Sequence, residues 1–511
     1  MLGLFGRKSD HPLADPKSAS DLMDSLPRND GPKALQELTD WVESICEDAA
    51  FRLDERFAAL RLLDENARPH KRKLTRELYS NSSLSGFQQN RLWTLLNEFA
   101  TQLSRAYGGV LAGYRNGDKG AAPLRTLQSL IAARAIHAAK GRLKCAAVRY
   151  AQADPEVWTL LAASYAQAES GGYLDEPLAL YPGYSADSSI RCEFAAALLW
   201  WMSGTGTLKP QQSHLAERLI MHWCQYYTVE AQPIAGTLLS FDLQQPGPPA
   251  RFTGEAMAHP ALRFIGLGQV QAQLDSLIKT LDKGIVPDEI NFGGSFSVEA
   301  VLDVAKRLTG FWASPPPMRR SPRRSIHVNL QVAGGFSRMV EQADSGFDPG
   351  IHAVDRWEVE EISAGGFRCI LPAGRDDDVR IGLLIGIRPE KVGHWGAGIV
   401  RRIGRDAQNR LHAGVEMLSS QVEGAVLREG NHSGMNEEQP ALWVRRGDID
   451  AGEAWLLMKL DTFSVNRTLL MRAAGRQYLL IPLALMERGE DYDFARYRLI
   501  EQEVSADEET Y

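Results

Sequence analysis

Two short stretches contain the residue types best suited to holding a ligand. The first is an arginine cluster just after three consecutive prolines; its members are Arg319, Arg320, Arg323 and Arg324. The second is Glu361-Ile362-Ser363-Ala364-Gly365-Gly366. Guanidinium groups bind phosphates in bidentate geometry and stack on flat rings. A serine hydroxyl followed by glycines lets a ligand approach the backbone closely. Together the stretches predict a site for an anionic molecule with aromatic rings, such as a nucleotide.

Short segments of alternating apolar residues surround both stretches. Residues 326–332 place apolar side chains on one face, and residues 356–360 lead directly into the serine-glycine stretch. Two further segments, 396–403 and 412–419, complete the region. Period-two alternation interrupted by Gly and Asp or Asn turns is typical of a sandwich or barrel. The sequence therefore predicts a small antiparallel β unit with the arginines on a linker at its entrance.

The order of these motifs resembles the PilZ domain, a bacterial receptor module for cyclic di-GMP. The signature of that family is Arg-x-x-x-Arg before the first strand, then Asp/Asn-x-Ser-x-x-Gly on the barrel. Arg319-x-x-x-Arg323 and Arg320-x-x-x-Arg324 both match the first half. Glu361-x-Ser363-x-x-Gly366 matches the second, with Glu in place of Asp or Asn. The resemblance extends over residues 319–420.

The resemblance implies a binding mode for cyclic di-GMP. The linker arginines would pair with its phosphates and stack on guanine, while Ser363, Gly365 and Gly366 would hold the other side. Glu361 is one methylene longer than the residue of the family and would contact the ligand differently or not at all. Residues 334–355 are predicted to form an extended loop. An alternative stays open, in which the barrel is a scaffold that binds no nucleotide and acts only through protein contacts.

Composition limits the remaining classes of function. The chain has 511 residues, 44% hydrophobic and 24% charged, which is typical of a soluble globular protein with several domains. Its net charge of −7 disfavours nucleic-acid binding through the arginine-rich segments 319–324 and 401–410. The five cysteines form no Cys-x-x-Cys pair, which favours a reducing compartment and disfavours a zinc site. The longest apolar run, 194–202, is too short to span a membrane. We therefore predict a cytoplasmic protein without a transmembrane segment.

Helical spacing dominates from Pro32 onward, with strand-like character near 237–253. Asp154-Pro155 predicts a helix start. The helix that follows, with Trp158 and Tyr165, resembles the first helix of a tetratricopeptide repeat. No second clean copy follows at the repeat period, so an irregular helical domain and a repeat array both remain open.

The predicted fold is multidomain α + β: an all-α N-terminal domain, a PilZ-like antiparallel barrel and a further small β-rich unit. The predicted boundaries are a disordered tail at 1–33, a helical interaction domain at 34–311, a Pro/Arg-rich linker at 312–324, the barrel at 325–425, the β-rich domain at 440–500 and an acidic tail at 501–511. No catalytic motif, cofactor motif or metal-binding spacing is found. The predicted function is a bacterial cyclic di-GMP effector, not an enzyme, that acts on a protein partner through its helical domain.

Overall fold

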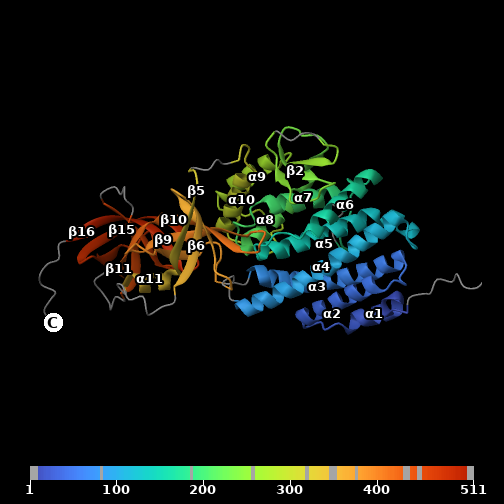
Figure 1. Cartoon of the computed structure of the whole chain (residues 1–511), viewed down its shortest axis with the longest axis horizontal. Helices are drawn as coiled ribbons and strands as arrows, with labels where there is room; N and C mark the ends of the chain where they lie inside the picture. The colour runs from blue at the N-terminus through green and yellow to red at the C-terminus, as the bar shows by residue number, and fades with distance from the viewer. Residues whose placement is uncertain are drawn as a thin grey trace, which may run out of the picture. The chain divides into compact units, whose positions relative to one another are not determined.

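A computed structural model describes residues 10–80, 84–183, 188–254, 259–316, 321–344, 354–374, 378–429, 438–445 and 452–502. The chain divides into two compact units, Met1–Met318 and Arg319–Tyr511. The first is mainly helical and the second is built of β-barrels (Figure 1). This confirms the predicted multidomain α + β class. No helix in the described ranges is long and apolar enough to cross a membrane.

The first unit is a bundle of helices in which α2 to α5 lie side by side (Figure 1). Its helices are α1 (Pro16–Ser25), α2 (Gly31–Glu47), α3 (Leu53–Ser80), α4 (Gly86–Asn116), α5 (Gln128–Val148), α6 (Pro155–Gly171), α7 (Ile190–Met202), α8 (Pro210–His222), α9 (Val270–Leu281) and α10 (Val298–Trp312). Short 3₁₀ turns lie at Pro12–Ala14, Ala122–Leu127 and Cys224–Tyr226. One continuous hydrophobic core joins them, so the unit is a single domain.

Local signals in the sequence explain where the longer helices begin and end. Ser85 and Gln88 form a reciprocal capping box at the start of α4. Asp154 caps α6 through the backbone N–H of Glu156, with Pro155 in the first turn, as predicted. Gly172 ends α6 with a φ of 73°, a left-handed conformation that glycine adopts without a steric cost.

A small antiparallel sheet follows α8 in the order β1-β4-β2-β3. Its strands are β1 (Thr228–Glu230), β2 (Thr237–Asp242), β3 (Ala250–Arg251) and β4 (Leu262–Gly266). Phe241 of β2 lies 5.4 Å from Phe194 of α7 between ring centroids, so the sheet shares the core of the helices. The strand-like segment seen in the sequence is therefore part of the helical unit and not a separate domain.

The N-terminal boundary differs from the prediction of a disordered tail over residues 1–33. Residues 1–9 lie outside the described residues, but α1 and the first turn of α2 are helical. Asp15 and Asp30 cap these helices, and Leu13, Ala19 and Leu26 are buried against the bundle. A few well-placed apolar residues therefore hold a segment whose composition is mostly polar.

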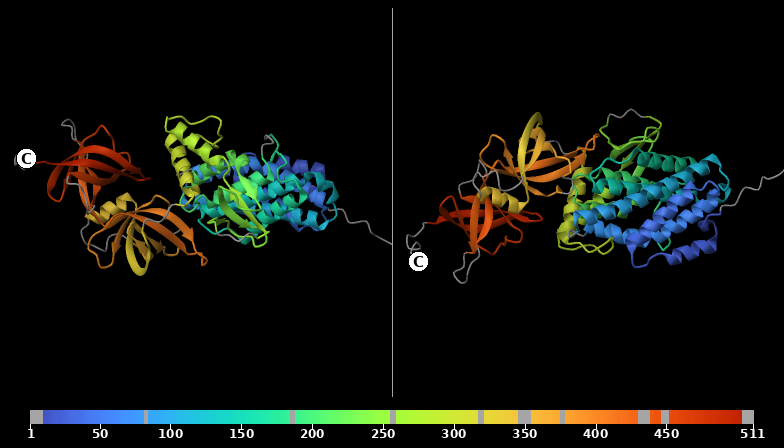
Figure 2. Two further views of the ribbon diagram at one scale, coloured as in Figure 1. Left: turned by 90° about the horizontal axis from the view of Figure 1, so that it is seen from above. Right: turned by 60° about the horizontal axis from the view of Figure 1, so that its bottom comes forward.

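The second unit consists of two closed six-stranded antiparallel barrels (Figure 2). The strands of the first barrel are β5 (Arg324–Gly334), β6 (Asp355–Ser363), β7 (Gly366–Ile370), β8 (Leu384–Pro389), β9 (Gly396–Arg405) and β10 (Leu411–Ser419). Those of the second are β11 (Gln421–Glu429), β12 (Gln439–Arg445), β13 (Glu453–Lys459), β14 (Leu469–Ala473), β15 (Arg476–Arg488) and β16 (Tyr492–Gln502).

The two barrels have the same strand order. Around the first barrel the order is β5-β6-β7-β10-β9-β8, and around the second it is β11-β12-β13-β16-β15-β14. When the strands of each barrel are counted from one to six, both follow 1-2-3-6-5-4. The predicted small β-rich unit is thus a complete second barrel. It begins at β11 and not at residue 440, and the predicted first barrel, 325–425, extends a few residues too far.

A helix and polar contacts join the barrels. The region predicted as an extended loop, 334–355, contains α11 (Phe336–Asp344), which contacts strands of both barrels (Figure 2). Asp491 of the second barrel accepts a 2.7 Å hydrogen bond from the backbone N–H of Phe336. Arg401 of β9 donates to both carboxylate oxygens of Glu487 of β15, at 2.7 and 2.5 Å. The sequence of this region shows no strand pattern. It forms a helix that covers the apolar surface between the barrels.

Candidate ligand-binding site

The structure brings two members of the arginine cluster, Arg323 and Arg324, next to the serine-glycine stretch. Arg323 precedes β5, and its Nη1 donates to Oε2 of Glu361 at 2.6 Å. About a third of each side chain is exposed, so the contact lies at the surface. Strands β5 and β6 pair antiparallel at this point, which places the beginning of β5 beside the end of β6. Two stretches that are far apart in the sequence therefore form one site.

Arg324 lies directly opposite Ile362 in the ladder, and Ser325 lies opposite Glu361. Opposed residues of an antiparallel pair point to the same face. The side chain of Ile362 is unusually exposed for its type, at 41%. An exposed guanidinium beside an exposed apolar surface can hold a flat anionic molecule. Arg319 and Arg320 lie outside the described residues.

The serine and the two glycines build the turn between β6 and β7. Ser363 Oγ donates to the carbonyl oxygen of Gly366 at 3.1 Å. A Cβ atom on Gly366 would lie 2.0 Å from the carbonyl oxygen of Val415, so this position requires glycine for packing. A Cβ atom on Gly365 would meet no atom within 4 Å. Space for a ligand is therefore present above Gly365, whereas Gly366 has a structural role of its own.

A second group of polar residues lies next to this turn and has no signal in the sequence. Arg368 of β7 lies opposite Glu361 in the ladder, and its Nη2 lies 3.2 Å from Nδ1 of His412. His412 is buried; its ring nitrogens lie 3.1 Å from Glu360 and 3.0 Å from Asp406. The hydrogen bond with His412 holds the pKa of the Asp406 carboxyl well below its ordinary value.

The contacts within this group hold the side chain of Arg368 in place beside Glu361. Its members come from β6, β7 and β10 and from the turn before β10, which adjoin only because the barrel closes. No spacing in the sequence could have found them. Arg368 is also paired with Glu360, 3.5 Å from its Nε, so the arrangement places an already compensated guanidinium group next to the Arg323–Glu361 contact.

Two of the four arginines in the second arginine-rich segment, 401–410, are paired with carboxylates. Arg401 contacts Glu416 at 2.7 Å in addition to Glu487, and Arg410 contacts Asp406 at 2.8 Å. Paired guanidinium groups offer little free charge to a polyanion. This region therefore adds little to the nucleic-acid interpretation.

The second unit is a β-barrel unit that follows a helical domain in the chain, and Arg323 and Arg324 lie beside its β6–β7 turn. The segment 319–324 that carries the four arginines is called the arginine arm below. Residues 17–233 match the model of a family described as the N-terminal domain of the cyclic-di-GMP receptor FimW. The match covers α1 to α8 almost completely together with β1, and it leaves both barrels outside. A search of curated proteins finds no match. The helical part of this chain is thus similar to the N-terminal domain of a cyclic-di-GMP receptor.

Proposed function

We propose that this protein is a cyclic di-GMP effector whose ligand binds between the arginine arm and the β6–β7 turn. The observation that carries the proposal is the Arg323–Glu361 contact, which joins the two halves of the motif in one place. The similarity of residues 17–233 to the N-terminal domain of a cyclic-di-GMP receptor supports the same ligand independently. The site consists of Arg319, Arg320, Arg323, Arg324, Glu361, Ser363, Gly365 and Gly366.

In this proposal the ligand competes with Glu361 for the arginines. A phosphate is a bidentate acceptor for a guanidinium group, as a carboxylate is, so Arg323 exchanges one anion for the other. The released carboxylate of Glu361 then accepts a hydrogen bond from the N–H groups of a guanine edge. Ser363 and the open space at Gly365 receive the opposite side of the ligand.

The proposed effector function follows from where the arm lies in the chain. Residues 313–323 connect the last helix of the first unit to the first strand of the barrel. A ligand that binds the arm to the barrel fixes this connection. Ordering of a segment by a ligand is an established way to change the relation between two domains. We propose that a protein partner of the helical domain senses this change.

The second candidate is a barrel that binds no nucleotide. It is favoured by the structural roles of Ser363 and Gly366, since the turn needs both without any ligand. The two candidates are separated by calorimetry on the full chain with cyclic di-GMP, linear GMP and ATP. Saturable binding of cyclic di-GMP, with much weaker binding of the other two, is expected. Absence of saturable heat with cyclic di-GMP would leave the scaffold as the better explanation.

A further inference from the structure

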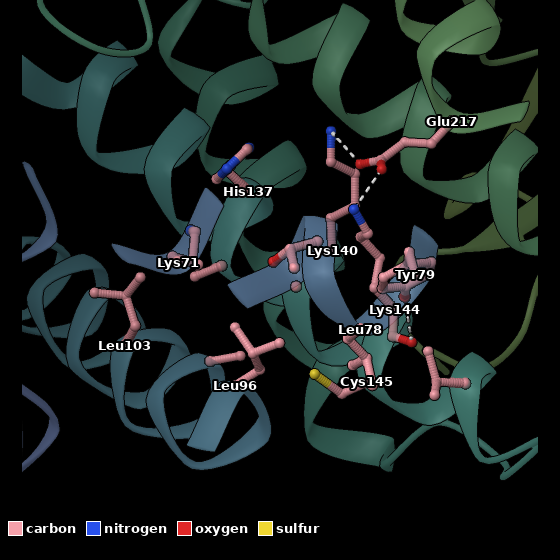
Figure 3. A pocket seen from close by; sticks show the side chains of 15 residues that line it. Lys71, Leu78, Tyr79, Leu96, Leu103, His137, Lys140, Lys144, Cys145 and Glu217 are labelled. Atoms are coloured by element: carbon pink, nitrogen blue, oxygen red, sulfur yellow. Dashed lines mark hydrogen bonds and ion pairs between the residues drawn. The ribbon is translucent and has the colours of Figure 1, made fainter. Parts of the chain in front are cut away.

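The helical unit contains a cavity of about 100 Å³ bounded by α3, α4, α5 and α8 (Figure 3). One part of its wall is apolar and includes Leu78, Leu96 and Leu103. Another part carries ionisable side chains (Figure 3). Sites for drug-sized ligands and cofactors span roughly 300–1,000 Å³. The cavity is therefore too small for a dinucleotide, but it has room for a molecule of a few heavy atoms.

Two of the cationic side chains in the wall are neutralised by the protein. Lys144 contacts Glu217 at 2.5 Å, and Lys140 lies 3.4 Å from Glu193 and 3.9 Å from Glu217. Figure 3 shows the two lysines joined to Glu217 on one side of the cavity. Buried charges are tolerated when they are paired in this way.

Lys71 is an exception. Among the described residues no carboxylate lies within ion-pair distance of its ammonium group; the ring of Phe99 lies 5.9 Å away, and the nearby Asp64 is paired with Arg134. Burial lowers the pKa of Lys71 below its ordinary value. The side chain of Lys71 is partly buried, and a partly buried ammonium group without a paired anion is less favourable than one that has such a partner.

His137 is the second exception, and it lies on the same side of the cavity as Lys71 (Figure 3). Its Nδ1 atom is buried and makes no hydrogen bond in the described structure. The nearest carboxylate oxygen, on Glu193, is 4.0 Å away, which is too far for one. Burial and the neighbouring lysines hold the pKa of His137 well below its ordinary value, so the ring is neutral near pH 7. A neutral ring with its proton on Nδ1 is an unused donor.

The pairing of the lysines that line the cavity gives the charge of a complementary ligand. Lys140 and Lys144 contact Glu193 and Glu217, and Asp64, which lies near Lys71, is paired with Arg134. Of the three lysines in the wall, Lys71 is the one without a paired carboxylate among the described residues. The ligand that satisfies both the charge and the apolar wall is a monoanion with a short hydrocarbon part.

We propose that this cavity binds a small monocarboxylate, with its carboxylate between Lys71 and His137 and its chain against Leu96 and Leu103. The ammonium group of Lys71 and the Nδ1–H group of His137 supply the two donors that a carboxylate accepts. This site is separate from the proposed dinucleotide site, which lies in the other unit and uses none of these residues. Each proposal can therefore fail without the other.

The test is thermal unfolding of the full chain with added sodium butyrate, butylammonium chloride, sodium phosphate or sodium chloride at equal ionic strength. Butyrate should raise the midpoint of the helical unit in a saturable manner, because a ligand that binds only the native state stabilises it. Butylammonium, which has the same chain and the opposite charge, should have no effect. Phosphate, which lacks the hydrocarbon chain, should raise the unfolding midpoint less than butyrate does. Equal shifts with all four salts, or a shift with phosphate alone, would overturn the proposal.

Replacement of single residues locates the effect. Lys71→Met keeps the length of the side chain and should weaken butyrate binding about 10- to 100-fold, the range expected for loss of a charge-assisted hydrogen bond. Lys73→Met changes an exposed lysine of the same helix and should bind butyrate normally. His137→Phe keeps the ring but removes the donor, and it should weaken binding even if the Lys71 variant fails to fold. Unchanged butyrate binding in both cavity variants would place the ligand elsewhere.

Discussion

The two barrels of the second unit share one strand order but differ in what surrounds it. Before β5 the chain carries the arginine arm, whereas a single residue, Ser420, separates β10 from β11. The second barrel therefore has no room for an arm at the start of its first strand. Since a fold by itself does not define a function, the proposed ligand site belongs to the arm and the β6–β7 turn of the first barrel.

One backbone feature recurs in both barrels. In the first, the N–H of Met417 donates to the carbonyl oxygen of Gly365 at 3.0 Å; in the second, the N–H of Leu499 donates to that of Gly452 at 2.6 Å. Both bonds join the sixth strand to a glycine before the third strand. The backbone carbonyl at this position therefore helps to close both barrels, whereas a Cβ atom there would meet no atom within 4 Å in either barrel. The arginines, Glu361 and Ser363 distinguish the first barrel as the proposed ligand site.

The largest effect is expected from removal of the arm's charge. Replacing Arg323 and Arg324 together by Ala should weaken cyclic di-GMP binding by about 3–6 kcal/mol, at about 1.5–3 kcal/mol for each charge-assisted contact. Titration calorimetry measures this loss. Arg356→Ala, at the opposite end of β6, is the matched control and should bind normally. Equal affinity for cyclic di-GMP in the double variant and the control would mean that these arginines do not distinguish the first barrel from the second as a ligand site.

A smaller effect, on stability, is expected from Gly366. Gly366→Ala forces a Cβ atom toward the carbonyl oxygen of Val415 and should destabilise the first barrel by about 1–3 kcal/mol, the usual cost of overpacking. Gly365→Ala meets only open space and should leave the unfolding midpoint nearly unchanged. Denaturant unfolding of both variants separates the glycine needed for closure from the one that leaves room for a ligand. If Gly365→Ala destabilised the barrel more than Gly366→Ala, this result would contradict the close approach of β7 and β10 at Gly366.

Replacement of Glu361 by Asp, the shorter residue of the PilZ motif, should have a modest effect on the affinity for cyclic di-GMP. Glu361→Asp draws the carboxylate away from Arg323 and makes the guanidinium more available to phosphate. Because the pair is exposed, we expect binding of cyclic di-GMP to stay equal or to improve by no more than about 1 kcal/mol. Calorimetry beside the wild-type chain provides the comparison. A large loss of affinity would mean that the longer side chain makes its own contact with the ligand.

The smallest effect is a difference in acid stability. Because the folded pKa of Asp406 lies below its ordinary value of 3.8, its contribution to stability is present above that value and is lost as the pH falls through the folded pKa. Asp406→Asn should therefore reduce stability at neutral pH and flatten the acid dependence of the first barrel. Unfolding midpoints measured from pH 7 downward show this. Parallel curves for the wild type and the variant would mean that Asp406 is not the group responsible.

Several features could be predicted from the sequence because their causes are local. Asp154 and Pro155 start α6 through contacts within one turn of helix. The alternation of residues 326–332 fixes one face of β5. The two halves of the binding motif were visible as residue types at short spacing. Their meeting could be expected only through the resemblance to a known family, since the Arg323–Glu361 contact depends on the pairing of β5 with β6.

Other features were decided by the tertiary structure alone, because they depend on residues that are distant in sequence. The tail was misjudged since Ala19 and Leu26 are buried by helices that follow much later. Helix α11 exists where two barrels leave an apolar surface to cover. The role of Gly366 is set by the carbonyl oxygen of Val415 across the ladder. Lys71 is an ordinary helical lysine in the sequence. Only the packing of α3 against α4 and α5 places it in a cavity wall, partly buried and with no paired carboxylate among the described residues.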